Sequence, residues 1–189
     1  MPDDIMKYKE FVKWLSDNDD DRIFLNSSQE HAVVVISQIF RRSSDTVRVY
    51  AKNLCQTIGN KPDYINALSD FVERNGHVRI LLNGYNDGCA KESDLYRRLA
   101  YYKSKGKDII VKTTTEKPYF SNDKAQNEIH FTIGDCSSYR IETDIEKQTA
   151  KCSMNRPETA KNFADFFDKM FGKNITKEVD LLKLFNYAK

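Results

Sequence analysis

The strongest candidate for chemistry in this chain is His130, which lies in a segment rich in polar residues between positions 128 and 155. A histidine beside phosphate-binding donors can attack phosphorus and form a covalent intermediate, while a second histidine protonates the leaving oxygen. The chain has three histidines, and the other two, His31 and His77, lie outside this segment and outside any repeat of its pattern. One chain therefore supplies half of a two-histidine site.

The order of predicted elements and the segment after His130 resemble one half of a phospholipase D superfamily domain, over residues 21–171. That family's motif reads His-x-Lys, then Asp, then Gly-Ser-x-Asn. Here His130 takes the histidine position, Thr132 stands where lysine belongs, and Ser137 stands where aspartate belongs. Residues 152–155 read Cys-Ser-Met-Asn and match the last part except for its glycine. The serine comes later than in the compact family motif, so an enlarged hairpin must separate the two parts.

The missing lysine is the most serious departure from the motif. Removing a preorganised cation or donor from a phosphoryl-transfer site commonly costs ~3 kcal/mol or more, and Thr132 supplies a hydrogen bond without a charge. Four basic residues are candidate replacements: Arg140, Lys147, Lys151 and Arg156. Three acidic residues could orient the imidazole but would also repel a phosphate: Asp135, Glu142 and Asp144.

These considerations give a specific site prediction. Catalytic roles fall on His130, Ser153 and Asn155, with Thr132 at the lysine position; binding roles fall on Arg140, Glu142, Lys151 and Arg156. No metal site is predicted. Strand alternation places Arg140 and Glu142 on one face, within cross-strand reach of His130 and Thr132 if the turn at 135–138 is tight.

A purely structural interpretation stands beside this one. His130 lies between Ile129 and Phe131 in an alternating strand, so it would point to the polar face or be buried with one hydrogen bond. Arg140 and Glu142 would then form a surface ion pair of small energetic weight. Ser153 and Asn155 would terminate a strand and cap the helix that Pro157 begins.

Alternating strand and helix patterns predict an α/β fold with a mixed, mainly parallel sheet flanked by helices. The expected strands are 22–26, 46–51, 77–83 and 108–114, followed by an antiparallel meander within 128–155. Helices are expected near the N-terminus, after residue 27, at 62–74, at 92–103 and around 163–170. The predicted organisation is an N-terminal helix and acidic linker (1–20), one α/β domain (21–171) and a C-terminal amphipathic helix (172–189), which packs on its own domain or on a partner.

Composition narrows the class of protein. Hydrophobic residues make up 40% and charged residues 31%, which is typical of a folded, soluble chain, and the net charge of +2 excludes binding to nucleic acid by bulk charge alone. The four cysteines have no C-x-x-C spacing, which favours free thiols and a cytoplasmic location. No apolar run approaches the ~18 residues needed to span a bilayer. We expect no cofactor and no membrane association.

Two further segments carry weaker signals. Residues 96–108 interleave basic and aromatic side chains, a pattern that suits nucleic-acid contact but is better explained by an amphipathic helix with half-buried tyrosines. Tyr50, Lys52 and Asn53 follow the expected carboxyl end of a strand, where open parallel sheets often bind ligands.

The resemblance implies a homodimer, since single-motif members of that superfamily build one site from two chains. Our first hypothesis is a phospholipase D-like module with a degenerate site and little or no catalysis, which binds nucleic acid or a partner protein, in a bacterial setting. The alternative is a dimeric, metal-independent phosphodiesterase or nuclease that uses His130 from two chains.

Overall fold

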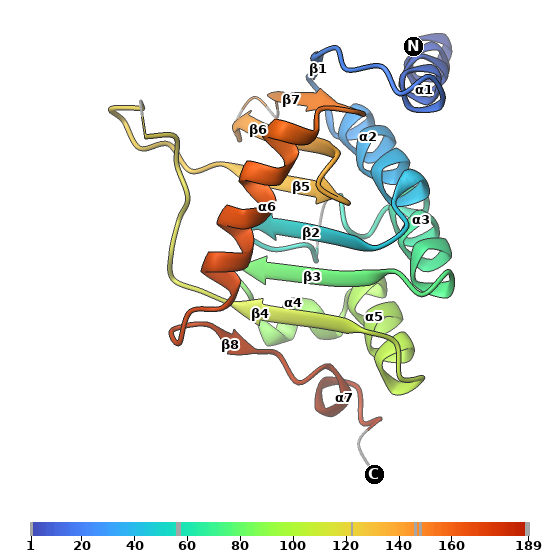
Figure 1. Cartoon of the computed structure of the whole chain (residues 1–189). Coiled ribbons are helices and arrows are strands. Elements are labelled where there is room, and N and C mark those ends of the chain that lie inside the picture. Colours follow the sequence, from blue (N-terminus) through green and yellow to red (C-terminus); the bar gives the residue numbers. More distant parts are fainter. Residues whose placement is uncertain (1, 56–57, 122, 146, 148, 188–189) are drawn as a thin grey trace.

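The computed structural model describes residues 2–55, 58–121, 123–145, 147 and 149–187. Within these residues one sheet of eight strands runs through the molecule in the order β1-β7-β6-β5-β2-β3-β4-β8 (Figure 1). The strands are β1 (Phe24–Asn26), β2 (Thr46–Ala51), β3 (His77–Leu82), β4 (Ile109–Thr113), β5 (His130–Gly134), β6 (Ser138–Asp144), β7 (Thr149–Ser153) and β8 (Lys177–Glu178). The helices are α1 (Pro2–Asp17), α2 (Gln29–Arg42), α3 (Pro62–Glu73), α4 (Asp87–Lys91), α5 (Asp94–Ser104), α6 (Pro157–Phe171) and α7 (Leu181–Leu184). The expected α/β class with a mixed sheet is confirmed, but the expectation of a mainly parallel sheet is wrong. Of the seven strand pairs among the described residues, two are parallel and five are antiparallel, because the meander, β1 and β8 all add to the sheet in the antiparallel sense.

Strands β2, β3 and β4 form the parallel part of the sheet. Parallel neighbours need a crossover connection, and here α3 and α5 provide it. Pro62 opens α3 at a position where its missing N–H costs nothing, and the Ser93 side chain accepts a hydrogen bond from the N–H of Tyr96 at the start of α5. The carboxyl ends of β2 and β3 therefore lie side by side at one edge.

The antiparallel meander predicted for residues 128–155 is also present. β5 pairs with β2 and β6, and β7 joins β6 to β1. The turn between β5 and β6 places Asp135 and Cys136 at φ of +48° and +56°. The Asp135 carboxylate accepts hydrogen bonds from the backbone N–H groups of Ser44, Asp45 and Thr46, which fixes this turn to the start of β2.

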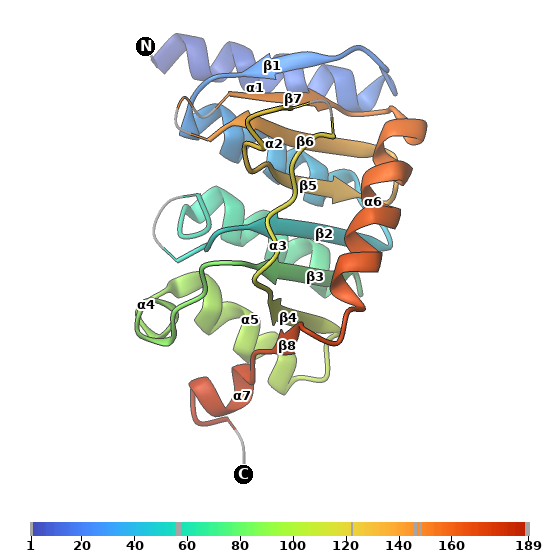
Figure 2. The ribbon, with the colours of Figure 1, turned by 90° about the vertical axis from the view of Figure 1, so that its left-hand side faces the viewer.

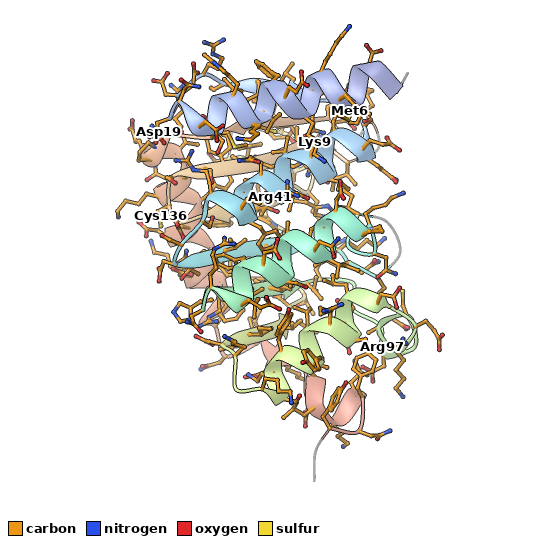
Figure 3. All side chains as sticks on the ribbon, turned by 90° about the vertical axis from the view of Figure 1, so that its right-hand side faces the viewer. Met6, Lys9, Asp19, Arg41, Arg97 and Cys136 are labelled. Carbon is orange, nitrogen blue, oxygen red and sulfur yellow. The ribbon has the colours of Figure 1, made fainter. Side chains whose placement is uncertain are left out.

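The helices cover the two faces of the sheet unequally. α1, α2, α3 and α5 lie in a row over one face (Figure 3), whereas α6 crosses the other face (Figure 2). Alternation along β5 sends Phe131 and Ile133 into a core cluster with Phe167 of α6. His130 and Thr132 consequently point to the opposite face.

The N-terminal helix is part of this packing, because Val12 and Leu15 of α1 are fully buried in the core that includes α2. β1 is followed by α2, as the expected strand–helix unit requires, and it lies antiparallel to β7 at the edge of the sheet.

The C-terminal segment differs from the single helix expected over 172–189. Residues 177–178 form β8, which pairs with β4, and the following helix α7 is one turn long. The buried side chain of Leu181 anchors this segment to the same core. A short apolar segment that cannot form a stable helix alone takes the conformation that its contact surface allows. Residues 188 and 189 lie outside the described part of the chain.

Candidate functional site

The candidate site lies on the face of β5 and β6 that is turned toward α2, opposite the face that α6 covers. The register of this strand pair places His130 opposite Glu142 and Thr132 opposite Arg140. Side chains directly across an antiparallel pair are in contact distance. The expected cross-strand proximity of these four residues is therefore confirmed, whereas their chemical roles stay predictions.

The imidazole of His130 has a carboxylate at each of its nitrogens. Nδ1 lies 3.1 Å from Oε2 of Glu142, and Nε2 lies 3.3 Å from Oε1 of Glu128. The side chain is 14% exposed, and the two glutamates are 9% and 17% exposed. Each ring nitrogen of His130 therefore lies within hydrogen-bonding distance of a carboxylate oxygen.

Arg140 and Glu142 form a buried ion pair. Nη2 of Arg140 lies 2.8 Å from Oε1 of Glu142, and Nε donates to Oδ1 of Asn26 at 2.9 Å. Burial by itself would raise the pKa of Glu142, but the hydrogen bond from His130 and the charge of Arg140 outweigh it and hold this pKa below its usual range. The pair is thus an internal element of the domain and differs from the surface ion pair of the structural interpretation.

The network continues on both sides of the ion pair. Cys152 places its sulfur 3.5 Å from Oδ1 of Asn26, and burial raises the pKa of this thiol to about 12. On the other side, Oε1 of Glu128 accepts hydrogen bonds from the Tyr50 hydroxyl at 3.1 Å and from Nδ2 of Asn83 at 2.6 Å. Burial and the neighbouring Glu128 raise the pKa of Tyr50, which keeps its hydroxyl as a donor.

A cavity of about 270 Å³ adjoins this network. One side is formed by the sheet, and another by α2, α3 and the segment after β2. Its lining residues include His130, Thr132, Arg140, Glu142, Val49, Tyr50, Lys52, Asn53, Leu54, Gln29, Ile36, Ile58 and Tyr64. The weak prediction that Tyr50, Lys52 and Asn53 mark a ligand site thus points to the same place as His130.

Other residues of the predicted site lie elsewhere. Ser153 is fully buried and donates to the carbonyl oxygen of Asp21, and Asn155 donates to that of Asp19. Both therefore fix the segment before β1. They lie toward the other end of the meander, since Ser153 is opposite Tyr139 while His130 is opposite Glu142.

Of the four basic residues predicted to replace the lysine, one lies beside His130 and three lie elsewhere. Arg140 joins the network around His130 through Glu142. Lys151 is exposed and pairs in register with Leu25 of β1, Arg156 is exposed next to Asp21, and Lys147 contacts Asp144. None of these three lines the cavity around His130.

Of the predicted carboxylates and the three histidines, only some lie near the cavity. Asp135 fixes the turn at the far end of β5, so Glu142 is the predicted carboxylate that orients the imidazole. His31 stacks on Tyr8 with ring centroids 3.8 Å apart, and His77 lies beside Asp108 at the start of β3. A second histidine at this cavity would have to come from another chain.

Sequence reasoning missed Glu128, Asn26 and Asn83. Glu128 carries a usable signal, because it lies two residues before His130 and alternation puts both on the same side. Asn26 and Asn83 come from distant segments and carry no such signal. Across the described residues, no group of three or more His, Cys, Asp or Glu side chains is arranged to hold a metal ion. In the same part of the chain, no helix is long and apolar enough to cross a membrane.

The cluster joins one guanidinium and one imidazole to two carboxylates. Arg140 contacts Glu142, and His130 contacts both Glu142 and Glu128. An incoming phosphate would meet two carboxylates beside the imidazole and a guanidinium that is already paired. The geometry suits a permanent polar network better than a site for a dianion.

Comparison with solved structures shows a phospholipase D-like fold, which confirms the fold implied by the sequence resemblance. Nuc from Salmonella typhimurium, a phospholipase D family member, matches with a TM-score of 0.54 and 16% identity over 84% of this chain and 96% of its own. Phosphatidylserine synthase from Haemophilus influenzae matches with a TM-score of 0.53 and 10% identity over 86% of this chain and 40% of its own.

TrmBL2, described as an archaeal chromatin protein with a novel mode of DNA binding, matches with a TM-score of 0.62 and 13% identity over 85% of this chain. The matched region spans only 54% of TrmBL2. At these identities the likeness establishes the fold alone. No protein-family model matches the sequence, and no curated protein matches it either.

Proposed function

We propose that this chain is a phospholipase D-like module that binds nucleic acid without cleaving phosphodiester bonds. One observation carries the absence of cleavage in this proposal: both nitrogens of His130 face carboxylates, at 3.1 Å and 3.3 Å. A nucleophilic imidazole needs a free lone pair directed at phosphorus. In this chain Glu128 and Glu142 occupy both directions in which a ring nitrogen could act.

The electrostatics support the same conclusion. A phosphoryl transition state needs positive charge or hydrogen-bond donors around its equatorial oxygens. Thr132 supplies no charge, and Arg140 is committed to Glu142 and Asn26. Hydrolysis at this site would therefore require the network to come apart first.

The binding surface that we infer lies on α5. Tyr96 and Tyr102 are buried in the core, as an amphipathic helix requires, but Arg97, Arg98 and Tyr101 face outward. Figure 3 shows Arg97 on the outer side of the helix layer. Arginines can neutralise phosphates while an exposed tyrosine stacks on a base.

A groove of about 500 Å³ supports this assignment. Arg97, Arg98 and Tyr101 line it together with Tyr187, and one carboxylate, Asp94, lies 3.7 Å from Arg97. The ammonium group of Lys105 lies 5.7 Å from the ring centre of Tyr101 and adds a further positive charge. The description of TrmBL2 as a DNA-binding chromatin protein is consistent with such a role for a module of this fold.

The first test separates binding from cleavage. Labelled single-stranded and double-stranded DNA and RNA are incubated with the protein in EDTA, and both anisotropy and product formation are followed. We expect retention that weakens steeply between 50 and 200 mM salt, with intact nucleic acid throughout. Cleavage that His130→Ala abolishes would establish the dimeric nuclease instead. No binding at low salt would overturn the proposal in favour of a protein partner.

A matched pair of charge reversals locates the surface. Arg97→Glu with Arg98→Glu should weaken binding about tenfold or more, because two phosphate contacts are lost and two repulsions are added. Lys161→Glu with Lys169→Glu makes the same change in net charge on exposed positions of α6. Equal losses in both variants would show that net charge, and no defined surface on α5, controls the binding.

Dimerisation also stays a prediction. Sedimentation equilibrium across a range of protein concentrations measures it directly. A dimer disrupted by a charge reversal near His130, such as Lys52→Glu, would fit association across the cavity, whereas a strict monomer would exclude a site shared between two chains.

A further inference from the structure

The groove on α5 contains two exposed aromatic rings that come from different parts of the chain. Tyr101 of α5 is 43% exposed, and Tyr187, in the segment after α7, is 42% exposed. Both line the same groove of about 500 Å³. Neither side chain belongs to the two hydrophobic core clusters, so packing of the core does not account for their presence here.

The surrounding structure holds both tyrosines in place. The Tyr101 ring packs edge-on against the ring of Tyr102, with centroids 5.4 Å apart, and the Tyr102 hydroxyl donates to Glu73 of α3 at 2.7 Å. The backbone N–H of Tyr187 donates to the carbonyl oxygen of Leu182 at 2.8 Å, and α7 packs on α5. A ring that is already positioned loses little freedom when a flat ligand stacks on it.

The charged groups of the groove lie on the same side of α5 as Tyr101. Positions 94, 97, 98 and 101 are three or four residues apart and therefore share one face of the helix. Arg97 and Arg98 can each bind a phosphate, but the carboxylate of Asp94 lies 3.7 Å from Arg97 and offsets one of the two positive charges. Part of the affinity for a nucleic acid is therefore left to the two tyrosine rings.

Stacking on these rings requires a base whose face is free. In a duplex each base is paired and stacked on its neighbours, whereas the bases of a single strand can turn outward onto aromatic side chains. Arg97 and Arg98 would contact the phosphates of either form, but Tyr101 and Tyr187 need an unpaired base. The exposed amide of Asn66, on the α3 side of the groove, can hydrogen-bond to the edge of such a base.

We propose that the groove on α5 is a site for single-stranded nucleic acid, in which Tyr101 and Tyr187 stack on unpaired bases while Arg97 and Arg98 bind the flanking phosphates. This inference rests on the proposed nucleic-acid function and adds the form of nucleic acid that the site takes. Single-stranded DNA and RNA present the same base faces and the same phosphates, so both belong to this class of ligand.

Matched oligonucleotides test the preference for single strands. A labelled strand of about 12 nucleotides, as DNA and as RNA, is compared by anisotropy at constant salt with the same strand annealed to its complement. We expect the single strand to bind at least about tenfold more tightly than the duplex, with the DNA and RNA arms separating the two sources. Equal binding, or tighter binding of the duplex, would overturn this inference but leave the proposed function in place. No binding of any probe would overturn both.

A strand with a central run of abasic sites separates stacking from phosphate contact. It carries the same number of phosphates as the intact strand but offers no base faces at the abasic positions. We expect it to bind about tenfold more weakly than the intact strand. Equal affinities would show that phosphate contacts alone hold the strand and would contradict stacking on the tyrosines.

The chain offers a matched control for the Tyr101 ring. Tyr119 is 45% exposed in the segment between β4 and β5 and does not line the groove. Tyr101→Leu should weaken single-strand binding about tenfold and leave duplex binding unchanged, because only stacking is lost, whereas Tyr101→Phe keeps the ring and should retain the wild-type affinity. Tyr119→Leu should leave both affinities unchanged. Equal losses in Tyr101→Leu and Tyr119→Leu, or a loss in Tyr101→Phe as large as in Tyr101→Leu, would contradict the stacking role.

The second ring and the arginines complete the comparison. Tyr187→Leu should also weaken single-strand binding selectively, whereas Arg97→Glu with Arg98→Glu should weaken single-strand and duplex binding alike, because both forms carry phosphates. Melting temperatures of the two leucine variants should match that of the wild type, since both rings lie outside the core clusters. Equal losses for single strand and duplex in the leucine variants would overturn the proposed stacking on unpaired bases.

Discussion

Alternate residues of β5 and β6 give the two faces of these strands different chemistry: one face is apolar and the other is polar and charged. Toward α6, Phe131, Ile133, Tyr139 and Ile141 pack in an aromatic and aliphatic cluster. Toward α2, the same strands carry His130, Thr132, Arg140 and Glu142. The apolar face gains stability from every side chain that it buries, whereas each buried charge on the polar face is tolerable only because a neighbour neutralises it.

This contrast shows which part of the phospholipase D-like fold depends on apolar packing and which part depends on charge pairing. The apolar face holds α6 against the sheet independently of chemistry, with Phe131 and Phe167 ring centroids 6.3 Å apart. The polar face must remain internally balanced if it no longer receives phosphate. Glu142 and Arg140 fulfil this condition, since they satisfy each other and His130.

The largest effect should come from the apolar face. Phe167 is fully buried between β5 and Phe171, so Phe167→Ala should lower the free energy of unfolding by about 3–5 kcal/mol. Urea denaturation measures this loss. The exposed neighbour Phe166→Ala is the matched control, with an expected cost below about 1.5 kcal/mol. Similar losses in both variants would contradict the assignment of this face as the stability core.

On the polar face, breaking the ion pair should cost nearly as much. Arg140→Met leaves Glu142 buried without its cation and should destabilise the protein by about 3 kcal/mol. Replacing both residues, as Arg140→Met with Glu142→Leu, should recover most of that loss, because neither the guanidinium nor the carboxylate of this pair is then left buried without its partner. A double-mutant cycle gives the coupling free energy between Arg140 and Glu142. If the losses in stability of the two single variants simply added up in the double variant, the two residues would not depend on each other.

A smaller effect should depend on pH. Glu142→Gln should cost about 1–2 kcal/mol at pH 5.5, because a charged hydrogen-bond acceptor becomes neutral. The folded-state pKa of Glu142 lies below its unfolded value, so its contribution is complete above the unfolded pKa and is lost as pH falls through the folded pKa. The difference from the wild type should therefore narrow between pH 5.5 and pH 3.

Glu10→Gln on the exposed side of α1 is the control for that measurement. Its stability difference should stay within about 0.5 kcal/mol at all pH values. A Glu142→Gln difference that widened on acidification would have the wrong sign and would show that the carboxylate is destabilising in the folded state.

The smallest effects should come from the two motif residues outside the network. Ser153→Ala should cost about 1 kcal/mol through its lost bond to Asp21, and Asn155→Ala about 0.5 kcal/mol through its more exposed bond to Asp19. Neither should change binding of nucleic acid. A selective loss of that binding would return these residues to the functional site.

Much of the architecture was predictable because local pattern and final environment agree. Strand β2 reads TVRVYA, α3 begins at Pro62, and the meander alternates apolar and polar residues. In each case the element in the structure is the one that the local sequence pattern predicts. The C-terminal segment was mispredicted as one helix because its apolar residues fit several conformations, and the edge of β4 decided between them.

The site was predictable only where it depended on neighbouring strands. His130, Thr132, Arg140 and Glu142 could be grouped because a tight turn joins their strands and fixes the register. The remaining part depends on segments far apart in sequence. Asn26 meets Arg140 across 114 positions, a contact that only the placement of β1 beside β7 creates.

By itself, the sequence determined the α/β class, the meander and the presence of threonine at position 132, since these follow from residue type and period. Tertiary structure alone decided that Ser153 and Asn155 bond to the segment before β1, and that Asn26 and Asn83 join the network around His130. The physical reason is that hydrogen bonding and charge pairing act over a few ångströms of space, and chain folding sets those distances independently of separation in sequence.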